Sequence, residues 1–211
     1  MKPASPLRRM RLRAFLAASA ASLLLAACGH SPPVQYYSLG RAAGEHSSPV
    51  SESGPSVVVG PVSIPAEVDR QQMVRIVDGV RLDVSSEHRW AAPLKMEVGR
   101  RVAGEIARRS GLERVVAWPQ NAYADPDLSL PIDIQRLETS AFDVVSLDAV
   151  WSLRHGGREV AGGRVRLSER IDAPDHAGIA RAHARIVDAL ASEMAARITV
   201  GGLRGVDARK Y

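Results

Sequence analysis

The residue with the clearest chemistry in this chain is Cys28, the only cysteine among its 211 residues. It follows an apolar run over residues 14–27, whose last two side chains, Ala26 and Ala27, leave room for a peptidase at the next bond. A thiol at that position can take a diacylglycerol and become the new N-terminus. Lys2 and four arginines precede the run, as in the charged start of an export signal. Its 14 residues are too few to span a bilayer, which needs about 20.

The segment Leu25-Ala26-Ala27-Cys28 resembles the lipobox of bacterial lipoproteins at every position. That resemblance predicts a signal peptide over residues 1–27 and a lipid anchor at Cys28, followed by a tether over residues 28–35. Gly29 stands where lipoproteins retained in the inner membrane commonly carry Asp. We therefore expect an outer-membrane lipoprotein that faces the periplasm. The alternative is an ordinary secretory signal with a cysteine near its cleavage site.

Removing residues 1–27 changes the charge balance of the chain. The full sequence has 28 basic and 23 acidic residues, and five of the basic ones lie in residues 1–27, which contain no acid. The remaining chain is therefore formally neutral, and its composition does not indicate a nucleic-acid partner. No later stretch of the sequence is apolar for long enough to predict a transmembrane helix.

Strand signals occur throughout the rest of the sequence. Residues 56–64 form a β-rich run, in which Gly60-Pro61 predicts a bend or an edge because proline donates no hydrogen bond to a ladder. Two valine-rich runs, 74–77 and 80–84, flank Asp78-Gly79, which favours a two-residue type I′ hairpin turn. Further strands are predicted at 34–39, 115–118, 130–137, 142–153 and 159–167, the last two as a second hairpin around His155-Gly156-Gly157.

Two long amphipathic helices complete the predicted elements. The first begins near Pro93 and ends at Gly111, and the second runs from about 175 to 199 with Asp175 near its N-cap. In the first helix, basic residues lie off the apolar stripe and are expected on a solvated face: Lys95, Arg100, Arg101, Arg108 and Arg109. The order of elements predicts the α/β class, with a mixed β-sheet in a single domain.

No catalytic or metal-binding pattern is evident in the sequence. There is no Gly-x-Ser-x-Gly motif, and the six histidines show no zinc-ligand spacing. His176 and His183 lie seven residues apart on a predicted helix, where surface or core-edge positions are a simpler explanation than a metal pair. We therefore assign no catalytic residue, no metal and no cofactor, and we expect a protein that is not an enzyme.

Three further segments carry a family resemblance. They are Val59-Gly60-Pro61-Val62-Ser63-Ile64-Pro65, then Asp69-Arg70, then His88-Arg89-Trp90-Ala91-Ala92-Pro93-Leu94. Together with the signal, an early Tyr36-Tyr37-Ser38-Leu39 strand and a later tryptophan strand, they resemble the PqiC/YmbA family of ABC-type transport auxiliary lipoprotein components. Val68 stands where that family usually has Leu, a conservative departure.

The resemblance implies a fold and a function. The fold is a three-layer α/β/α arrangement, here a PqiC-like auxiliary lipoprotein domain over residues 36–200 with a C-terminal tail over 201–211. The function is that of a non-catalytic accessory subunit of a trans-envelope transport system for lipids or other hydrophobic compounds, with an MCE-domain periplasmic protein as partner and membrane integrity as the outcome. The alternative is a stand-alone lipoprotein that binds a small apolar ligand in a pocket of roughly 300–1,000 Å³. The resemblance leaves open whether the protein forms a homo-oligomer.

The same segments supply candidate interface residues, since Trp and Arg are enriched where proteins bind one another. Trp90 is equally explained as a cap on the core beside a helix that starts at Pro93. Asp69-Arg70 is equally explained as a structural ion pair or a clamp on a loop. The partner-interface candidates are Asp69, Arg70, Arg89, Trp90, Pro93 and Leu94.

Overall fold

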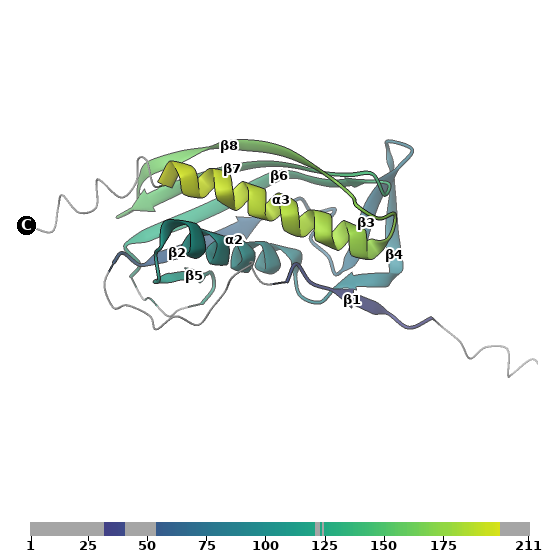
Figure 1. Ribbon diagram of the computed structural model, residues 1–211, viewed down its shortest axis with the longest axis horizontal. Helices are drawn as coiled ribbons and strands as arrows, with labels where there is room; N and C mark the ends of the chain where they lie inside the picture. Colours follow the sequence, from purple (N-terminus) through teal and green to yellow (C-terminus); the bar gives the residue numbers. More distant parts are fainter. Residues whose placement is uncertain (1–31, 41–53, 121–122, 124, 199–211) are drawn as a thin grey trace, which may run out of the picture. The chain divides into compact units, whose positions relative to one another are not determined.

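The structure is a computed structural model in which residues 32–40, 54–120, 123 and 125–198 are described (Figure 1). The predicted signal peptide, Cys28 and the tail over 201–211 lie outside these residues. From Val34 onward, the described residues form one mixed sheet of eight strands together with two long helices. No helix among them is both long and apolar enough to cross a membrane.

The elements follow the predicted order, with longer strands in the second half of the chain. The strands are β1 (Gln35–Tyr37), β2 (Val57–Ser63), β3 (Gln72–Val77), β4 (Arg81–Trp90), β5 (Val115–Ala117), β6 (Leu128–Ser140), β7 (Val144–His155) and β8 (Arg158–Arg170). The helices are α2 (Leu94–Ser110) and α3 (His176–Arg197).

Strand β6 is the centre of the sheet. On one side it pairs with β7 along its length, and β7 pairs with the outer strand β8, both antiparallel. On the other side β6 has two different parallel neighbours. Its first half pairs with β2, and its last residue, Ser140, pairs with Ile76 of β3. The sheet then continues in two directions, from β2 to β5 and from β3 through β4 to β1.

Both predicted hairpins form, and both use positive φ angles at their turns. Asp78 and Gly79 have φ of 55° and 77°. Val77 pairs with Arg81, however, so this loop also takes in Val80 and is one residue longer than predicted. The second hairpin turns at Gly156-Gly157, with φ of 54° and 77°.

Gly60 explains the predicted bend in β2. Val59 pairs with Leu130 and Val62 with Ile132, so the register shifts across Gly60-Pro61. Gly60 has φ of 119°, and a Cβ there would lie 2.9 Å from the Cβ of Trp118. Only glycine fits this close approach without displacing its neighbour.

The helix boundaries follow from local capping. Pro93 precedes α2, and Gly111 ends it in the left-handed conformation with φ of 70°. At α3, the side chain of Asp175 accepts a 2.6 Å hydrogen bond from the backbone N–H of Gly178, which confirms it as the N-cap. The predicted extension of α3 to residue 199 lies outside the described residues.

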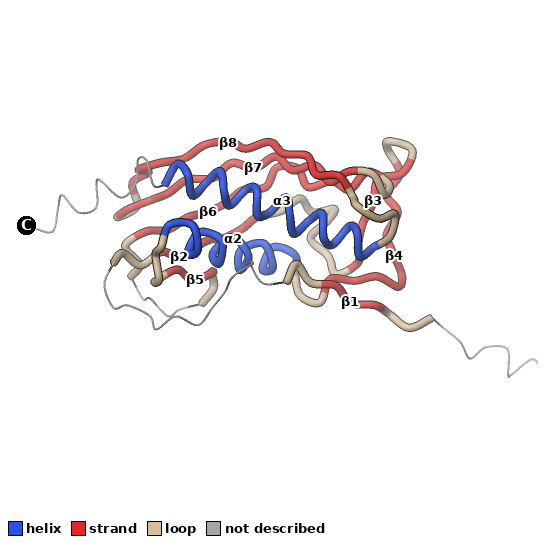
Figure 2. Tube along the Cα trace, viewed as in Figure 1, coloured by secondary structure: helices blue, strands red, loops and turns tan. Residues whose placement is uncertain are grey.

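Both helices cover the same face of the sheet (Figure 2). Helix α2 packs on β2 and β5, α3 packs on β7 and β8, and the two helices contact each other. The α/β class, the mixed sheet and the two long helices are thus confirmed. The layers differ from the expected α/β/α arrangement, because the opposite face, with Val150, Arg164 and Arg166 exposed, carries no helix in the described part.

Alternation along β7 shows which face is the core. Val145, Leu147 and every second residue to Leu153 are at most 2% exposed and point toward the helices. The apolar stripe of α2, from Leu94 to Ile106, is equally buried and meets them. This shared burial holds the helices to the sheet.

One expectation about α2 is wrong. Arg101 lies not on a solvated face but at the contact between the helices, and is 9% exposed. Its Nε donates a 2.6 Å hydrogen bond to Asp188 of α3. Beneath Arg108 and Arg109 lies Glu105, which is 2% exposed and accepts a hydrogen bond from each. Sequence periodicity identified the apolar stripe but not these acidic partners.

Candidate functional site

Two of the segments that carry the family resemblance, residues 69–70 and 88–94, meet at one corner of the sheet. The carboxylate of Asp69 lies 2.9 Å from the Nζ of Lys95 in the first turn of α2. The backbone N–H of Trp90 donates a 2.7 Å hydrogen bond to the carbonyl of Gln71. The turn before β3 is therefore fastened both to the end of β4 and to the start of α2.

The turn itself is built on Pro65. The backbone N–H groups of Val68 and Asp69 both donate to the carbonyl of Pro65, each at 3.1 Å. This tight turn directs Arg70 outward, where it is exposed. Asp69 and Arg70 therefore do not form an ion pair with each other, since the partner of Asp69 is Lys95.

Two of the candidate interface residues belong to the core. Trp90 is 3% exposed and Leu94 is 1% exposed. The indole of Trp90 meets the ring of His183 on α3 edge-on, with centroids 5.2 Å apart. Trp90 thus lies where a residue that caps the core is expected. Its side chain packs inside the corner and is not exposed to a partner. Pro93 is exposed at the N-cap of α2.

Arg89 points away from the core, on the face of β4 opposite to Trp90. Its neighbour in register on β1 is Tyr36, which is 61% exposed. The Nε of Arg89 is buried and has no hydrogen-bond partner in the residues that the structure describes. Of the six candidates, Asp69, Arg70 and Pro93 are therefore accessible and Arg89 is half-buried.

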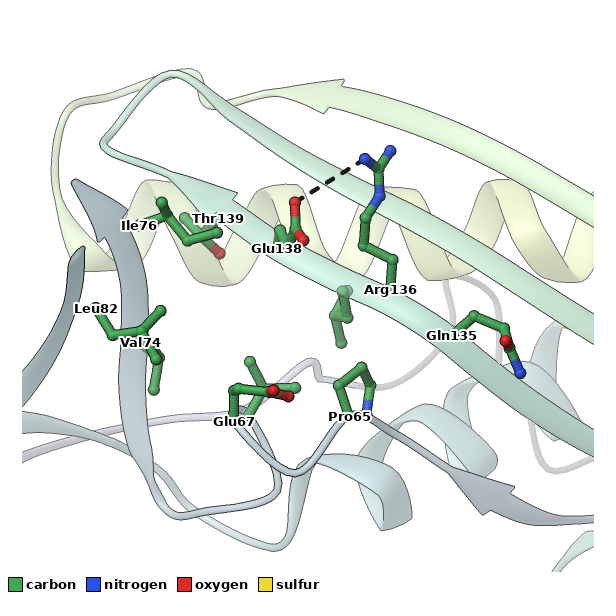
Figure 3. A pocket seen from close by; sticks show the side chains of 11 residues that line it. Pro65, Glu67, Val74, Ile76, Leu82, Gln135, Arg136, Glu138 and Thr139 are labelled. Carbon is green, nitrogen blue, oxygen red and sulfur yellow. Dashed lines mark ion pairs between the residues drawn. The ribbon is translucent and has the colours of Figure 1, made fainter. Parts of the chain in front are cut away.

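The turn over residues 65–68 also forms one wall of a pocket of about 230 Å³ (Figure 3). The hairpin of β3 and β4 forms the second wall, with Val74, Ile76 and Leu82. Residues 135–139 of β6 form the third wall. In Figure 3 the labelled side chains of Val74 and Leu82 lie across from those of β6, with Glu67 and Pro65 between them.

The pocket exists because β6 lacks a neighbouring strand there. Pairing with β2 stops at Ser63 and Asp133, and pairing with β3 occurs only at Ile76 and Ser140. Residues 134–139 consequently have no strand partner on that side among the described residues. Unpaired strand edges of this kind are templates for added chains.

The lining is apolar on the hairpin side and mixed on the β6 side. Leu82 and Val84 are 45% and 41% exposed on one face of β4, while Asp83 points the other way and pairs with Arg75. Across the pocket, Arg136 and Glu138 form a loose ion pair at 4.0 Å. The alternation of Leu82, Asp83 and Val84 is the sequence signal for an apolar face on β4. Alternation alone does not show that this face is exposed, because both faces of a strand can be covered.

Three histidines, His88, His176 and His183, form ring contacts. His176 stacks on His88 with centroids 3.6 Å apart, and the Nδ1 of His88 lies 3.0 Å from the hydroxyl of Tyr37. Partial burial, with the positive charges of His88 and Arg75, lowers the pKa of His176 to about 4. Full burial lowers the pKa of His183 to about 4. Within the described ranges, no group of three His, Cys, Asp or Glu residues is placed to hold a metal ion.

Comparison with known proteins identifies both the fold and the family. A crystal structure of an uncharacterized protein superposes with a TM-score of 0.63 at 15% identity, covering 78% of this chain and 98% of that one. Protein XCC0632 from Xanthomonas campestris, of the DUF330 family model, gives a TM-score of 0.60 at 15% identity, covering 78% and 93%. These likenesses show the fold.

No curated protein matches the chain. The model of a family described as the ABC-type transport auxiliary lipoprotein component matches residues 37–195, a span that includes the corner, the pocket, α2 and most of α3. This chain belongs to the ABC-type transport auxiliary lipoprotein component family.

Proposed function

We propose that this protein is a non-catalytic accessory subunit of a trans-envelope transport system that moves lipids or other hydrophobic compounds and so supports membrane integrity. Its lipid anchor at Cys28 holds it to the outer membrane, facing the periplasm, and its partner is an MCE-domain protein. The family match over residues 37–195 supports a transport auxiliary role. The lipobox supports the anchor, and Gly29 after it supports the choice of membrane.

The open edge of β6 is the observation that carries the docking part of this proposal. Residues 134–139 have backbone groups without a strand neighbour on one side in the described part of the chain, and an apolar wall stands opposite them. An extended segment of a partner can add to such an edge through main-chain hydrogen bonds, while alternate side chains fill the adjoining pocket. We assign this role to an extended segment of the MCE-domain partner.

The volume of the pocket favours docking over ligand storage. A pocket that buries most of a small apolar ligand has roughly 300–1,000 Å³, and this one has about 230 Å³. That space accommodates a few side chains of a docked segment. The glutamate and arginine at its rim, Glu67 and Arg136, suit a peptide better than an acyl chain, because charged groups lose hydration against hydrocarbon.

The corner fixes the geometry of this docking site. Asp69 and Lys95 join the turn over residues 65–70 to α2, and the buried Trp90 anchors the end of β4. The wall formed by Pro65 and Val68 is therefore held at a set distance from β6. Arg70, exposed beside this wall, is placed to meet an acidic residue of the partner.

The test is a binding measurement between the full-length lipidated protein in detergent and the MCE-domain protein of the same genome. Leu82→Glu places a charge on the apolar wall and is expected to weaken binding at least about tenfold, or 1.4 kcal/mol. Val160→Glu is the matched control, since Val160 is 42% exposed and Leu82 is 45% exposed. The control is expected to bind as the unaltered protein does.

Equal binding by the two variants would place the partner elsewhere on the molecule. Absence of binding by the unaltered protein, with recovery of a bound lipid or small apolar molecule by mass spectrometry, would favour the stand-alone binder. Replacement of Cys28 by Ser separates the two parts of the proposal. It removes the anchor, but it should leave the purified domain able to bind the MCE-domain protein.

A further inference from the structure

A buried hydrogen-bond donor on β7, away from the corner, has no acceptor in the described part of the chain. Trp151 lies on β7 facing the helices and is 2% exposed. Its Nε1 is buried and has no hydrogen-bond partner among the described residues. A buried donor left without an acceptor is unfavourable, because it has lost its hydrogen bond to water. Either the fold tolerates this unpaired indole N–H, or the N–H forms part of a binding site.

A cation lies against the same indole. Gly163 on β8 is the register partner of Trp151. The space that a Cβ at Gly163 would need is filled by the guanidinium of Arg197, and the Nε1 of Trp151 lies 3.8 Å from that same point. The missing side chain at Gly163 therefore lets an arginine from the last turn of α3 reach over the sheet to the buried indole.

Arg197 forms no ion pair with a carboxylate in the part of the chain that the structure describes, unlike Arg181 and Arg185 earlier in α3. One carboxylate oxygen close to this stretch of β8 is Oε1 of Glu159, which lies 2.8 Å from where a Cβ at Gly162 would be. Since successive residues of a strand face opposite sides, Glu159 lies on the side of β8 away from Arg197. Two donors thus lie close together, and no carboxylate of the described residues pairs with either of them.

We propose that the indole N–H of Trp151 and the guanidinium of Arg197 bind a phosphate group. A guanidinium presents its donors as a planar fork that engages two oxygens. A phosphate has oxygens beyond the two that the guanidinium engages, and the indole N–H can donate to one of these. This site is independent of the docking proposal, and either can fail without the other.

The simpler explanation is that Arg197 only complements the negative end of the α3 dipole, as basic residues in a last helical turn commonly do. That explanation predicts no ligand. It also predicts that the indole of Trp151 is indifferent to phosphate, so the two explanations differ in what a spectroscopic probe of that N–H would show.

The experiment follows the indole N–H signals of the ¹⁵N-labelled full-length protein in uncharged detergent. The chain has three tryptophans, and Trp151→Phe assigns the relevant signal by its loss. Inorganic phosphate is added against potassium chloride of matched ionic strength. The expected result is a saturable shift of the Trp151 signal while those of Trp90 and Trp118 stay in place.

Two variants remove the second donor in different ways. Arg197→Ala deletes the guanidinium, and Gly163→Ala places a methyl group where the guanidinium lies. Each is expected to weaken phosphate binding at least about tenfold, since the charge-assisted hydrogen bonds of the guanidinium are lost. Arg181→Ala is the control on the same helix, where the arginine already pairs with Asp172, and should bind phosphate normally.

A parallel titration uses a short-chain phosphatidic acid, which distinguishes a lipid headgroup from free phosphate as the source. Tighter binding of the lipid than of inorganic phosphate identifies the headgroup as the ligand, and equal or weaker binding identifies the free anion. The proposal is overturned if neither ligand shifts the Trp151 signal. It is also overturned if Arg197→Ala binds phosphate as well as the unaltered protein.

Discussion

Arg101 of α2 and Asp188 of α3 form a two-point ion pair between the helices, with Nε–Oδ1 and Nη2–Oδ2 distances of 2.6 Å each. The Arg101 side chain is 9% exposed and that of Asp188 is 28% exposed. The same guanidinium donates to the carbonyl of Leu39, just after β1. A single side chain thus joins three segments that are far apart in the sequence.

Loss of the Asp188 carboxylate is expected to destabilise the fold markedly. Asp188→Ala should lower the free energy of unfolding by about 2–3 kcal/mol, because a largely buried guanidinium loses two charge-assisted hydrogen bonds. Urea unfolding followed by circular dichroism measures the change. The control is Arg81→Ala at the exposed Asp78 pair, whose side chains are 72% and 78% exposed. That variant should change stability by no more than about 0.5 kcal/mol.

The helices and hairpins were predictable because their signals are local. Pro93, Gly111 and Asp175 each set a helix end through their own backbone or side chain. Asp78-Gly79 likewise adopts the positive φ angles that its composition suggests. The extra loop residue at Val80 depends on pairing between strands, which the turn alone does not determine.

The pocket was not predictable, because it results from pairings distant in the sequence. Ser63 meets Asp133, and Ile76 meets Ser140. The open stretch of β6 is the interval between those two pairings, and no local pattern encodes it. The same reason explains Arg101, whose periodic position indicates only that it lies off the apolar stripe. Its burial requires knowing that α3 packs against that side of α2.

Glycine at position 60 is expected to be indispensable to β2. Gly60→Ala adds a Cβ at a φ of 119° and 2.9 Å from the Cβ of Trp118, so both backbone conformation and space oppose it. We expect it to lower the free energy of unfolding by at least about 2 kcal/mol. Gly79→Ala is the comparison, with φ of 77° and no atom within 4 Å, and should cost about 1 kcal/mol.

Equal losses of stability in the two glycine variants would show that the close approach to Trp118 contributes nothing. In that case the conformational preference at φ above zero would account for both effects. Thermal unfolding of the two variants in the same buffer makes the comparison direct, and a larger fall in Tm for Gly60→Ala is the expected outcome.

Stability should fall as the pH is lowered from 6.5 to about 4. Burial lowers the pKa of His183 from 6.5 to about 4 in the folded protein. Above pH 6.5 the imidazole is neutral in both states and contributes no pH dependence. Below it, only the unfolded chain takes up the proton, which favours unfolding by up to about 1.4 kcal/mol per pH unit. Across the window this amounts to roughly 3 kcal/mol.

Urea unfolding at several pH values between 7.5 and 4.5 measures this slope, to which His176 contributes in the same direction. His183→Gln removes one titrating group and should make the slope shallower, whatever its effect on stability at pH 7.5. An unchanged slope would mean that His183 takes up its proton in the folded state as readily as in the unfolded state.

The carboxylates of Asp148 and Asp172, with pKa values of about 2, lose their stabilising contribution only below about pH 3.8.

The membrane that holds the protein should depend on the residue after the lipidated cysteine. Gly29→Asp introduces the residue commonly found in lipoproteins retained in the inner membrane. We expect it to move the protein from the outer-membrane to the inner-membrane fraction, while Gly29→Ser stays in the outer membrane. Sucrose-gradient fractionation with immunodetection measures the distribution. Two causes would keep Gly29→Asp in the outer-membrane fraction: capture by the proposed partner, or a different sorting rule. Repeating the fractionation with Leu82→Glu in the same chain separates these causes, since only capture depends on the apolar wall beside β6.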